Sequence, residues 1–307
     1  MSSILLRRIG AAVVTIWAVF TISFIIVRAA PGGPFDAERD PPADVKRAIE
    51  ERYNLDAPLW SQYLDQIRGW IVLDPGPSLR QPDHDVASIL SAGLPISLLL
   101  GGLALVLGTT IGIVLGMLAA LRVGGWLDHL VVVIASIGIS LPLYVIAGIL
   151  VLGVSFGLGW LPPAGWESVP SLVLPVLCLA LAPAAQAARL VRSGLVEMSG
   201  EEFARTARAK GISPFSVLLR HCLRPALIPL VTTIGPTAAA LLTGSLVIEQ
   251  IFAIPGVGMH FIQGALNRDY PLVLGAVLLY TVVLQLLTLL ADLLLIALDP
   301  RLRGESR

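Results

Sequence analysis

The sequence predicts an all-α integral membrane protein with six transmembrane helices. Of its 307 residues, 56% are hydrophobic and 14% are charged, whereas a soluble domain carries roughly a quarter charged residues. The mean hydropathy is +0.84, and the apolar residues gather in long uncharged stretches. We therefore expect much of the surface to face lipid. A net charge of zero argues against a nucleic-acid binder.

Six uncharged stretches are each long enough to cross a bilayer core, which takes about 20 helical residues. They are 9–27, 86–121, 130–166, 168–188, 225–248 and 270–291. The second includes a leading segment around residues 88–95. A breaker cluster at 161–165 trims the third stretch, which we expect to form one helix. The first is longer than the usual signal-peptide core, so we expect it to remain as a transmembrane helix.

The basic residues predict the orientation. Six spans put both termini on the same side, where Arg7, Arg8 and the C-terminal arginines lie. The connection at 189–224 is rich in basic residues, whereas Arg268 is the basic residue of the short connections on the opposite side. The positive-inside rule therefore places the termini and the 189–224 connection in the cytosol. The long acidic segment between the first two spans is then external, and we expect helices around 44–52 and 59–73.

The 199–229 segment has the local signals of two short helices. Ser199 and Glu202 fit a capping box, which predicts a helix that follows as far as Lys210. Gly211 suits the end of that helix. The Ser-Pro pair at 213–214 fits a second helix start, with proline in the first turn.

The first of these short helices has a face of small residues. Ala204, Ala207 and Gly211 are spaced three and four apart, so they lie on one side of the helix. The charged residues beside them are Glu201, Arg205 and Arg208. Such a strip is suited to a groove on another protein. It is equally suited to lying on the bilayer surface or on the chain's own bundle, and the pattern leaves both interpretations open.

The sequence lacks the motifs of several kinds of chemistry. No Walker-type phosphate loop occurs, so ATP-driven work would need a separate ATPase chain. Gly108, Gly112 and Gly116 lie inside an apolar run, where glycines let helices approach closely. The four histidines and two cysteines have no metal-ligand spacing, and we find no catalytic constellation. We therefore predict neither catalytic nor metal-binding residues.

Ionisable residues within spans are candidates for a functional path. Glu249, with its neighbour Gln250, stands at the outer end of the fifth span, and Asp292 stands late in the sixth. They are either path residues or markers of the span boundaries. Buried acids are scarce, which favours an ATP-driven pump over a proton- or sodium-coupled carrier. Prolines that bend the spans for packing, or that shape a path, are Pro142, Pro175, Pro183, Pro229 and Pro236.

The sequence EFARTARAKG at 202–211, followed by HCLRP at 221–225, resembles the coupling loop of binding-protein-dependent ABC permeases. The general family pattern is Glu-Ala-Ala, three residues, Gly, nine residues, then Ile-x-Leu-Pro. Here Arg205, Thr206 and Ala207 stand at the first three positions and Gly211 at the glycine, while Pro225 comes one place late. These departures resemble the dipeptide and oligopeptide branch of the family.

Motifs in the same order along the whole chain are similar to that branch. They are RRI at 7–9, PGGP at 31–34, NLDAP at 54–58, QY at 62–63, FAIPGVG at 252–258, RDYP at 268–271 and DPR at 299–301. The resemblance implies the type I ABC importer permease fold. It divides the chain into a tail with the first helix (1–30), an external segment (31–90) and a core permease domain (91–307) that includes a coupling loop at 194–229.

The resemblance also implies a function and partners. The chain would be a non-enzymatic permease subunit that carries di- or oligopeptides, or else nickel chelates, glutathione or another small solute. Its partners would be a second homologous permease, ATPase subunits that bind ATP and Mg²⁺, and an external substrate-binding protein, in the inner or plasma membrane. Residues implied in ATPase docking are Glu201, Glu202, Ala204, Arg205, Ala207, Arg208 and Gly211. The six-helix plan alone also allows an ATP-independent carrier or channel, or a membrane scaffold.

Overall fold

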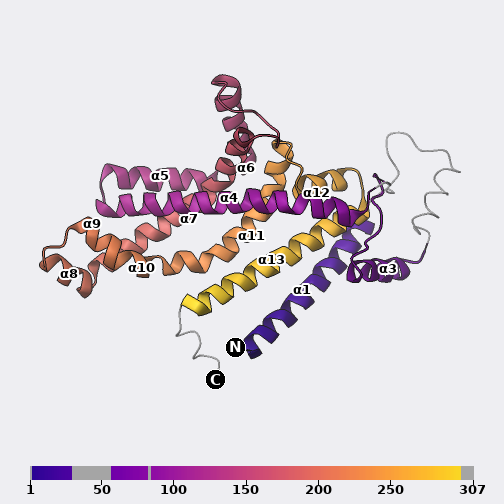
Figure 1. Cartoon of the computed structure of the whole chain (residues 1–307), viewed down its shortest axis with the longest axis horizontal. Helices are drawn as coiled ribbons and strands as arrows, with labels where there is room; N and C mark the ends of the chain where they lie inside the picture. Colours follow the sequence, from indigo (N-terminus) through magenta and orange to yellow (C-terminus); the bar gives the residue numbers. More distant parts are fainter. Residues whose placement is uncertain (1, 30–56, 82–83, 299–307) are drawn as a thin grey trace. The chain divides into compact units, whose positions relative to one another are not determined.

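The computed structural model describes residues 2–29, 57–81 and 84–298, which form helices joined by turns (Figure 1). The first half contains α1 (Ser2–Ala29), α3 (Leu59–Ile71), α4 (Val86–Leu121), α5 (Trp126–Ser140), α6 (Leu143–Leu150) and the π-helical η1 (Val151–Gly157). The second half contains α7 (Val169–Gly200), α8 (Glu202–Ala209), α9 (Pro214–Val217), the π-helical η2 (Leu218–Cys222), α10 (Leu223–Ala226), α11 (Ile228–Ile251), α12 (Val257–Leu266) and α13 (Tyr270–Leu298). Helix α3 confirms the prediction at 59–73, and the helix expected at 44–52 lies outside the described residues.

Five described helices are long and apolar enough to cross a membrane, and a bent pair makes six when it counts as one span. The five are α1, α4, α7, α11 and α13. The leading segment at 88–95 is the first part of α4 itself.

The third uncharged stretch, 130–166, was expected to form one helix, and this prediction is wrong. Helix α5 ends at Ser140, and the following helix leaves at an angle of 109°. Pro142 explains the break, because its ring disfavours a helical conformation at the preceding residue. Leu141 accordingly has extended dihedrals, with φ −81° and ψ 134°.

The chain folds as two compact units. One contains Met1–Ile96 and Pro255–Gln285, and the other contains Ser97–Ile254 and Leu286–Arg307. Helices α4 and α13 each contribute to both units. The boundaries predicted from the sequence, 1–30, 31–90 and 91–307, divide the chain by its course through the membrane. The two compact units divide it by internal contacts, so they do not test those boundaries, which stay a prediction.

In the first unit, α3 packs on the C-terminal half of α1. The ring of Tyr63 lies 5.5 Å from that of Phe20 and 5.3 Å from that of Phe24. The Tyr63 hydroxyl is also 2.8 Å from the hydroxyl of Thr21. These contacts attach α3 directly to the first apolar helix.

Asp269 organises the turn that precedes α4. Its carboxylate is 1% exposed and accepts hydrogen bonds from the Ser78 hydroxyl and from the backbone N–H groups of Leu79 and Leu272 at 3.2 and 3.3 Å. A buried carboxylate is tolerated when several donors surround it. Asp269 belongs to the RDYP motif at 268–271, so this part of the resemblance has a structural role.

In the second unit, α7 is the central helix, beside α5, α6, α10 and α11. The predicted close approach of the glycine stripe on α4 is confirmed. A Cβ at Gly108 would come within 2.5 Å of the carbonyl oxygen of Ala180, and one at Gly116 within 2.7 Å of the carbonyl oxygen of Ala188. Gly112 lies between them on the same face. The backbone of α7 therefore occupies the space that side chains on α4 would need.

Candidate functional site

Helix α8 begins at Glu202, so the capping box predicted at Ser199 is wrong. Helix α7 continues past Ser199, whose hydroxyl donates to the carbonyl oxygen of Val196 at 2.8 Å instead of capping α8. Glu201 takes the N-cap position without a side-chain cap. The Arg208 guanidinium donates to the carbonyl oxygen of Ser199 at 2.9 Å. Arg208 thus satisfies a carbonyl that the end of α7 leaves open.

The predicted end of this helix and the start of the next are confirmed. Helix α8 ends at Ala209, and Gly211 follows with φ +82°, a conformation that favours glycine. Ser213 is the N-cap of α9, and its hydroxyl accepts from the backbone N–H of Ser216 at 3.4 Å. Pro214 stands in the first turn. The segment therefore turns sharply at Gly211 and returns towards the bundle through α9 and η2.

The small face of α8 packs against the chain's own bundle. Ala204 is fully buried and Ala207 is 6% exposed. The buried cluster that contains them also includes Ala187, Val191, Leu195, Val217, Leu218, Cys222, Ala226 and Leu230. These residues come from α7, α9, η2, α10 and α11. Ala204 and Ala207 therefore follow the second interpretation of the strip, which is packing on the chain's own bundle. Their burial joins α8 to the long helices α7 and α11.

The side chains around the small face of α8 are exposed. Glu201, Glu202 and Arg205 are exposed. Phe203 is 43% exposed on the same short helix, although aromatic side chains are usually buried. The sequence pattern of small and charged residues on this helix does not by itself point to Phe203. Successive residues of a helix point about 100° apart. Because Ala204 points inwards, its neighbour Phe203 points away from the buried cluster.

Cys222 lies in the same cluster as Ala204. Burial raises the pKa of its thiol, and the charge of Arg208 offsets part of this effect. A thiol is inert as a nucleophile when it stays protonated. Cys222 therefore acts as a small packing residue at this site.

An ion pair joins α5 to α7 close to this cluster. The Asp128 carboxylate accepts from Nε and Nη2 of Arg192, the latter at 2.7 Å, and from the backbone N–H of Gly124 at 2.8 Å. The side chain of Asp128 is 4% exposed and that of Arg192 is 28% exposed. A bidentate pair of this kind is stronger than a single-contact one. It holds the turn before α5 against α7.

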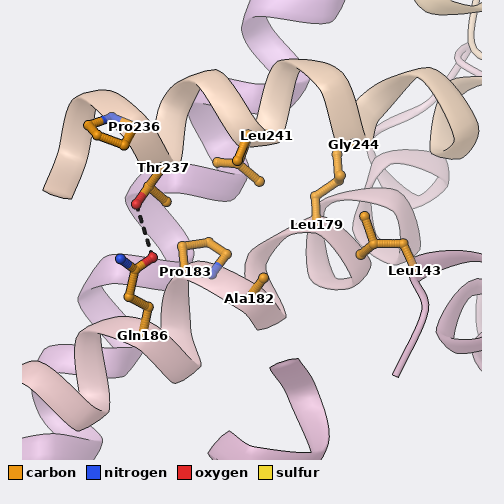
Figure 2. A pocket seen from close by; sticks show the side chains of 10 residues that line it. Leu143, Leu179, Ala182, Pro183, Gln186, Pro236, Thr237, Leu241 and Gly244 are labelled. Carbon is orange, nitrogen blue, oxygen red and sulfur yellow. Dashed lines mark hydrogen bonds between the residues drawn. The ribbon is translucent and has the colours of Figure 1, made fainter. Parts of the chain in front are cut away.

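A cavity of about 340 Å³ opens between α6, α7 and α11 (Figure 2). Its lining residues are Leu143, Leu179, Ala182, Pro183, Gln186, Pro236, Thr237, Ala240, Leu241 and Gly244. Among these lining residues, the polar side chains are Gln186 and Thr237. Figure 2 shows the two side chains pointing toward each other, and the Thr237 hydroxyl donates to Oε1 of Gln186 at 3.0 Å. The cavity can hold an organic solute against apolar walls with one polar contact point.

Prolines shape the walls of this cavity. Pro183 is inside α7 and Pro236 is inside α11, and both line the cavity. Leu143 follows the break at Pro142. Prolines inside helices bend them, so three of the five prolines named from the sequence lie at or next to the cavity. Pro175 lies within α7 away from the lining, and Pro229 stands in the first turn of α11.

The predicted path residues lie at the C-terminal end of α11. Glu249 is fully buried, whereas Gln250 is exposed. Neither belongs to the residues that line the cavity. The placement of the Asp292 side chain lies outside the described residues.

Comparison with known proteins identifies the family. Residues 112–304 match the family described as binding-protein-dependent transport system inner membrane component. The dipeptide transport system permease protein DppB of Bacillus subtilis is 40% identical over 307 residues, which is 100% of both chains. The oligopeptide transport system permease protein OppB of Escherichia coli K12 is 38% identical over 305 residues, covering 99% of this chain and 100% of that one.

Solved structures show the fold. The inward-facing MetNI methionine ABC transporter aligns with a TM-score of 0.56 and 21% identity, over 69% of this chain and 96% of that chain. An amino acid ABC transporter crystallised with histidines aligns with a TM-score of 0.51 and 17% identity, over 70% and 94%. The expected type I importer permease fold is thus confirmed. The chain is a multi-pass membrane protein that belongs to the family of binding-protein-dependent transport system inner membrane components.

Proposed function

We propose that this chain is the permease subunit of an ATP-driven importer that carries di- or oligopeptides delivered by an external binding protein. The single observation that carries this proposal is the similarity of the whole chain, end to end, to dipeptide and oligopeptide permeases. ATP and Mg²⁺ belong to the partner ATPase, because the sequence has no phosphate loop. Relatives of the branch that take nickel chelates or glutathione share the same architecture and are the alternative substrates.

The chain would work beside a second, homologous permease subunit, with the translocation path between the two. Both termini and the 199–229 segment would face the cytosol, as the positive-inside rule predicts. Three basic residues on and just after α8 are exposed, namely Arg205, Arg208 and Lys210. Exposed basic residues support a cytosolic position of the 199–229 segment. Gln250, exposed at the end of α11, would contact the solute at the external side, and Glu249 would hold that end from within.

The transmission of force follows from the packing of α8. The ATPase would contact the exposed side of the helix at Glu201, Glu202 and Arg205, with Arg208 and Gly211 holding its two ends in place. Ala204 and Ala207 would act from the inner side, because they fix α8 to the buried cluster on α7 and α11. Helices α7 and α11 also form walls of the cavity. A movement of α8 would therefore change the shape of the cavity directly.

Uptake by the reconstituted complex tests this function. Vesicles that hold this chain, its companion permease and the ATPases should accumulate a labelled dipeptide or oligopeptide when ATP and the binding protein are present. Full flux with this chain alone and without ATP would favour an ATP-independent carrier. A complex that assembles but moves none of the solute classes named above would favour a scaffold.

We expect Phe203→Ala to weaken ATPase recruitment by roughly 30-fold, because truncation of an aromatic anchor at an interface costs about 2 kcal/mol. The measurement is the affinity of the ATPase for the permease in detergent or nanodiscs. Leu219→Ala is the matched control, since Leu219 on η2 has the same exposed fraction, 43%. Equal recruitment by the parent protein and by Phe203→Ala would remove Phe203 from the docking surface.

We expect Gln186→Leu to reduce the kcat/KM of peptide uptake about tenfold, because loss of one neutral hydrogen bond costs about 1 to 1.5 kcal/mol. The amide of Gln186 would exchange its bond with Thr237 for one with the peptide backbone. Thr243→Val is the control on α11, because the Thr243 hydroxyl donates to Ala239 of its own helix at 2.9 Å. Uptake at the parent rate with intact ATPase recruitment would exclude this cavity from the path.

A further inference from the structure

Helix α3 presents three different faces around its axis. At about 100° per residue, Trp60, Leu64 and Ile71 fall within about 40° of one another. All three are exposed, at 69%, 41% and 76%. This apolar face lies on the outside of a helix that the sequence places between two spans. Contiguous exposed apolar surface of this kind marks a contact with lipid or with another protein.

The second face is polar and the third is packed on protein. Ser61, Asp65 and Arg68 lie together on the next part of the wheel, and Asp65 and Arg68 are exposed. The side that carries Tyr63 and Trp70 packs inwards. Tyr63 contacts α1, and Trp70 packs on the buried cluster of α4, α12 and α13 within the same unit. The helix therefore separates a protein contact, an apolar surface and a polar surface.

The contact with α1 gives the depth of α3. The apolar span of α1 is Leu6–Ala29, and Tyr63 bonds to Thr21. Thr21 stands about 12 Å from the end of α1 at 1.5 Å per residue. A span of this length exceeds a hydrocarbon core of about 30 Å by only a few ångströms. Tyr63 thus reaches α1 below the outer boundary of the hydrocarbon core, and α3 itself lies near that boundary. Figure 1 shows α3 beside the C-terminal end of α1.

The residues after α3 extend the apolar surface. Val72 and Leu73 are 69% and 78% exposed. Leu73 has φ +60°, which is an outlier for a bulky residue. The chain holds the Leu73 side chain outwards although the backbone conformation of this residue is unfavourable. Tryptophan at a membrane–water boundary is typical, because its ring is apolar with one polar group.

We propose that α3 is an interfacial anchor helix that lies in the outer leaflet at headgroup depth, with Trp60, Leu64 and Ile71 inserted between lipids. The occupant of the apolar face is lipid because Tyr63 attaches α3 directly to α1, whose apolar span Leu6–Ala29 is itself long enough to cross the bilayer. This proposal is independent of the transported solute.

Spin labels test the proposal in the full chain, reconstituted with its partners in phosphatidylethanolamine–phosphatidylglycerol nanodiscs. Cys178 and Cys222 are first replaced by alanine. Leu64→Cys and its neighbour Asp65→Cys are then labelled, and power saturation compares access of oxygen, which enters lipid, with that of a water-soluble nickel chelate. We expect the ratio of oxygen to nickel access to be several-fold higher at position 64 than at position 65. Ile71→Cys with Arg68→Cys provides a second pair if the first variant folds poorly.

Two other outcomes would overturn the proposal. High nickel access at positions 64 and 71 would mean that the face is in water. Low access of both reagents with an immobilised spectrum would mean that a protein, such as the companion permease or the binding protein, covers it. Peptide uptake by the complex is measured separately, so either result would overturn the anchor proposal without contradicting the proposed transport function.

Discussion

Replacement of Gly112 by alanine is expected to lower the melting temperature of the purified permease by about 5 °C or more, which corresponds to an overpacking cost of roughly 2 kcal/mol. A Cβ at this position would overlap the carbonyl oxygen of Ala184 and come within 2.5 Å of Cβ of Ala187. The obstacle is partly backbone, so no change of rotamer relieves it. Helices α4 and α7 would have to move apart, and the cluster that holds α8 would lose part of its packing.

Gly102→Ala is the control for this prediction. Gly102 is on the same helix, and a Cβ there would meet nothing within 4 Å. Alanine favours a helix over glycine by about 0.5–1 kcal/mol, so the control variant should melt at or slightly above the parent temperature. Both substitutions replace glycine by alanine on the same helix. The expected changes in melting temperature have opposite signs only because α7 lies against Gly112 and nothing lies against Gly102. A Gly112→Ala protein as stable as the Gly102→Ala protein would show that α4 and α7 do not pack as closely as described.

Arg192→Leu is expected to destabilise the protein by about 3 kcal/mol, near the lower end of the range for a buried pair that loses one partner. The loss leaves the carboxylate of Asp128, 4% exposed, with the N–H of Gly124 as its remaining described donor. The partial exposure of Arg192 moderates the cost, because water screens the pair on that side. Arg192→Lys should recover only part of the stability, since lysine cannot make the two parallel bonds.

The double variant Asp128→Leu with Arg192→Leu distinguishes the pair from general packing. If the two residues act together, the double variant should lose less stability than the sum of the single variants. Arg189→Leu is the control, as Arg189 is exposed on α7 one turn earlier. Thermal unfolding followed by size-exclusion chromatography provides the measurement. Additive losses of stability would mean that the two side chains do not interact in the folded protein.

When ATPase recruitment and melting temperature are measured for these variants and for Phe203→Ala, effects on docking can be distinguished from effects on folding stability. Gly112→Ala and Arg192→Leu change the fold that supports α8, so they should reduce ATPase recruitment only in proportion to lost folded protein. Phe203→Ala changes an exposed side chain, so recruitment should fall at an unchanged melting temperature. The direction of each effect follows from burial alone.

Properties that depend on local sequence could be predicted. Helices α1, α4, α7, α11 and α13 follow from the length and apolarity of single stretches. The turn at Gly211 follows from the freedom of glycine to adopt a positive φ, and the second helix start follows from serine before proline at 213–214. The close approach at Gly108, Gly112 and Gly116 follows from three missing side chains on one helix face. Each signal is present within a few residues, so no knowledge of distant neighbours is required.

Properties that depend on distant neighbours were decided by the tertiary structure. Asp128 and Arg192 are 64 residues apart, and nothing local connects them. Ala204 and Ala207 turn inwards because α7, η2 and α11 provide an apolar surface there, and this leaves Phe203 outside. Ser199 continues α7 rather than capping α8 for the same reason, since the helix is stabilised by packing along its length. The sequence by itself determined five of the apolar spans and the turns at Gly211 and Ser213, because these depend on neighbouring residues. The faces that point to lipid, core or partner depended on which helices pack together.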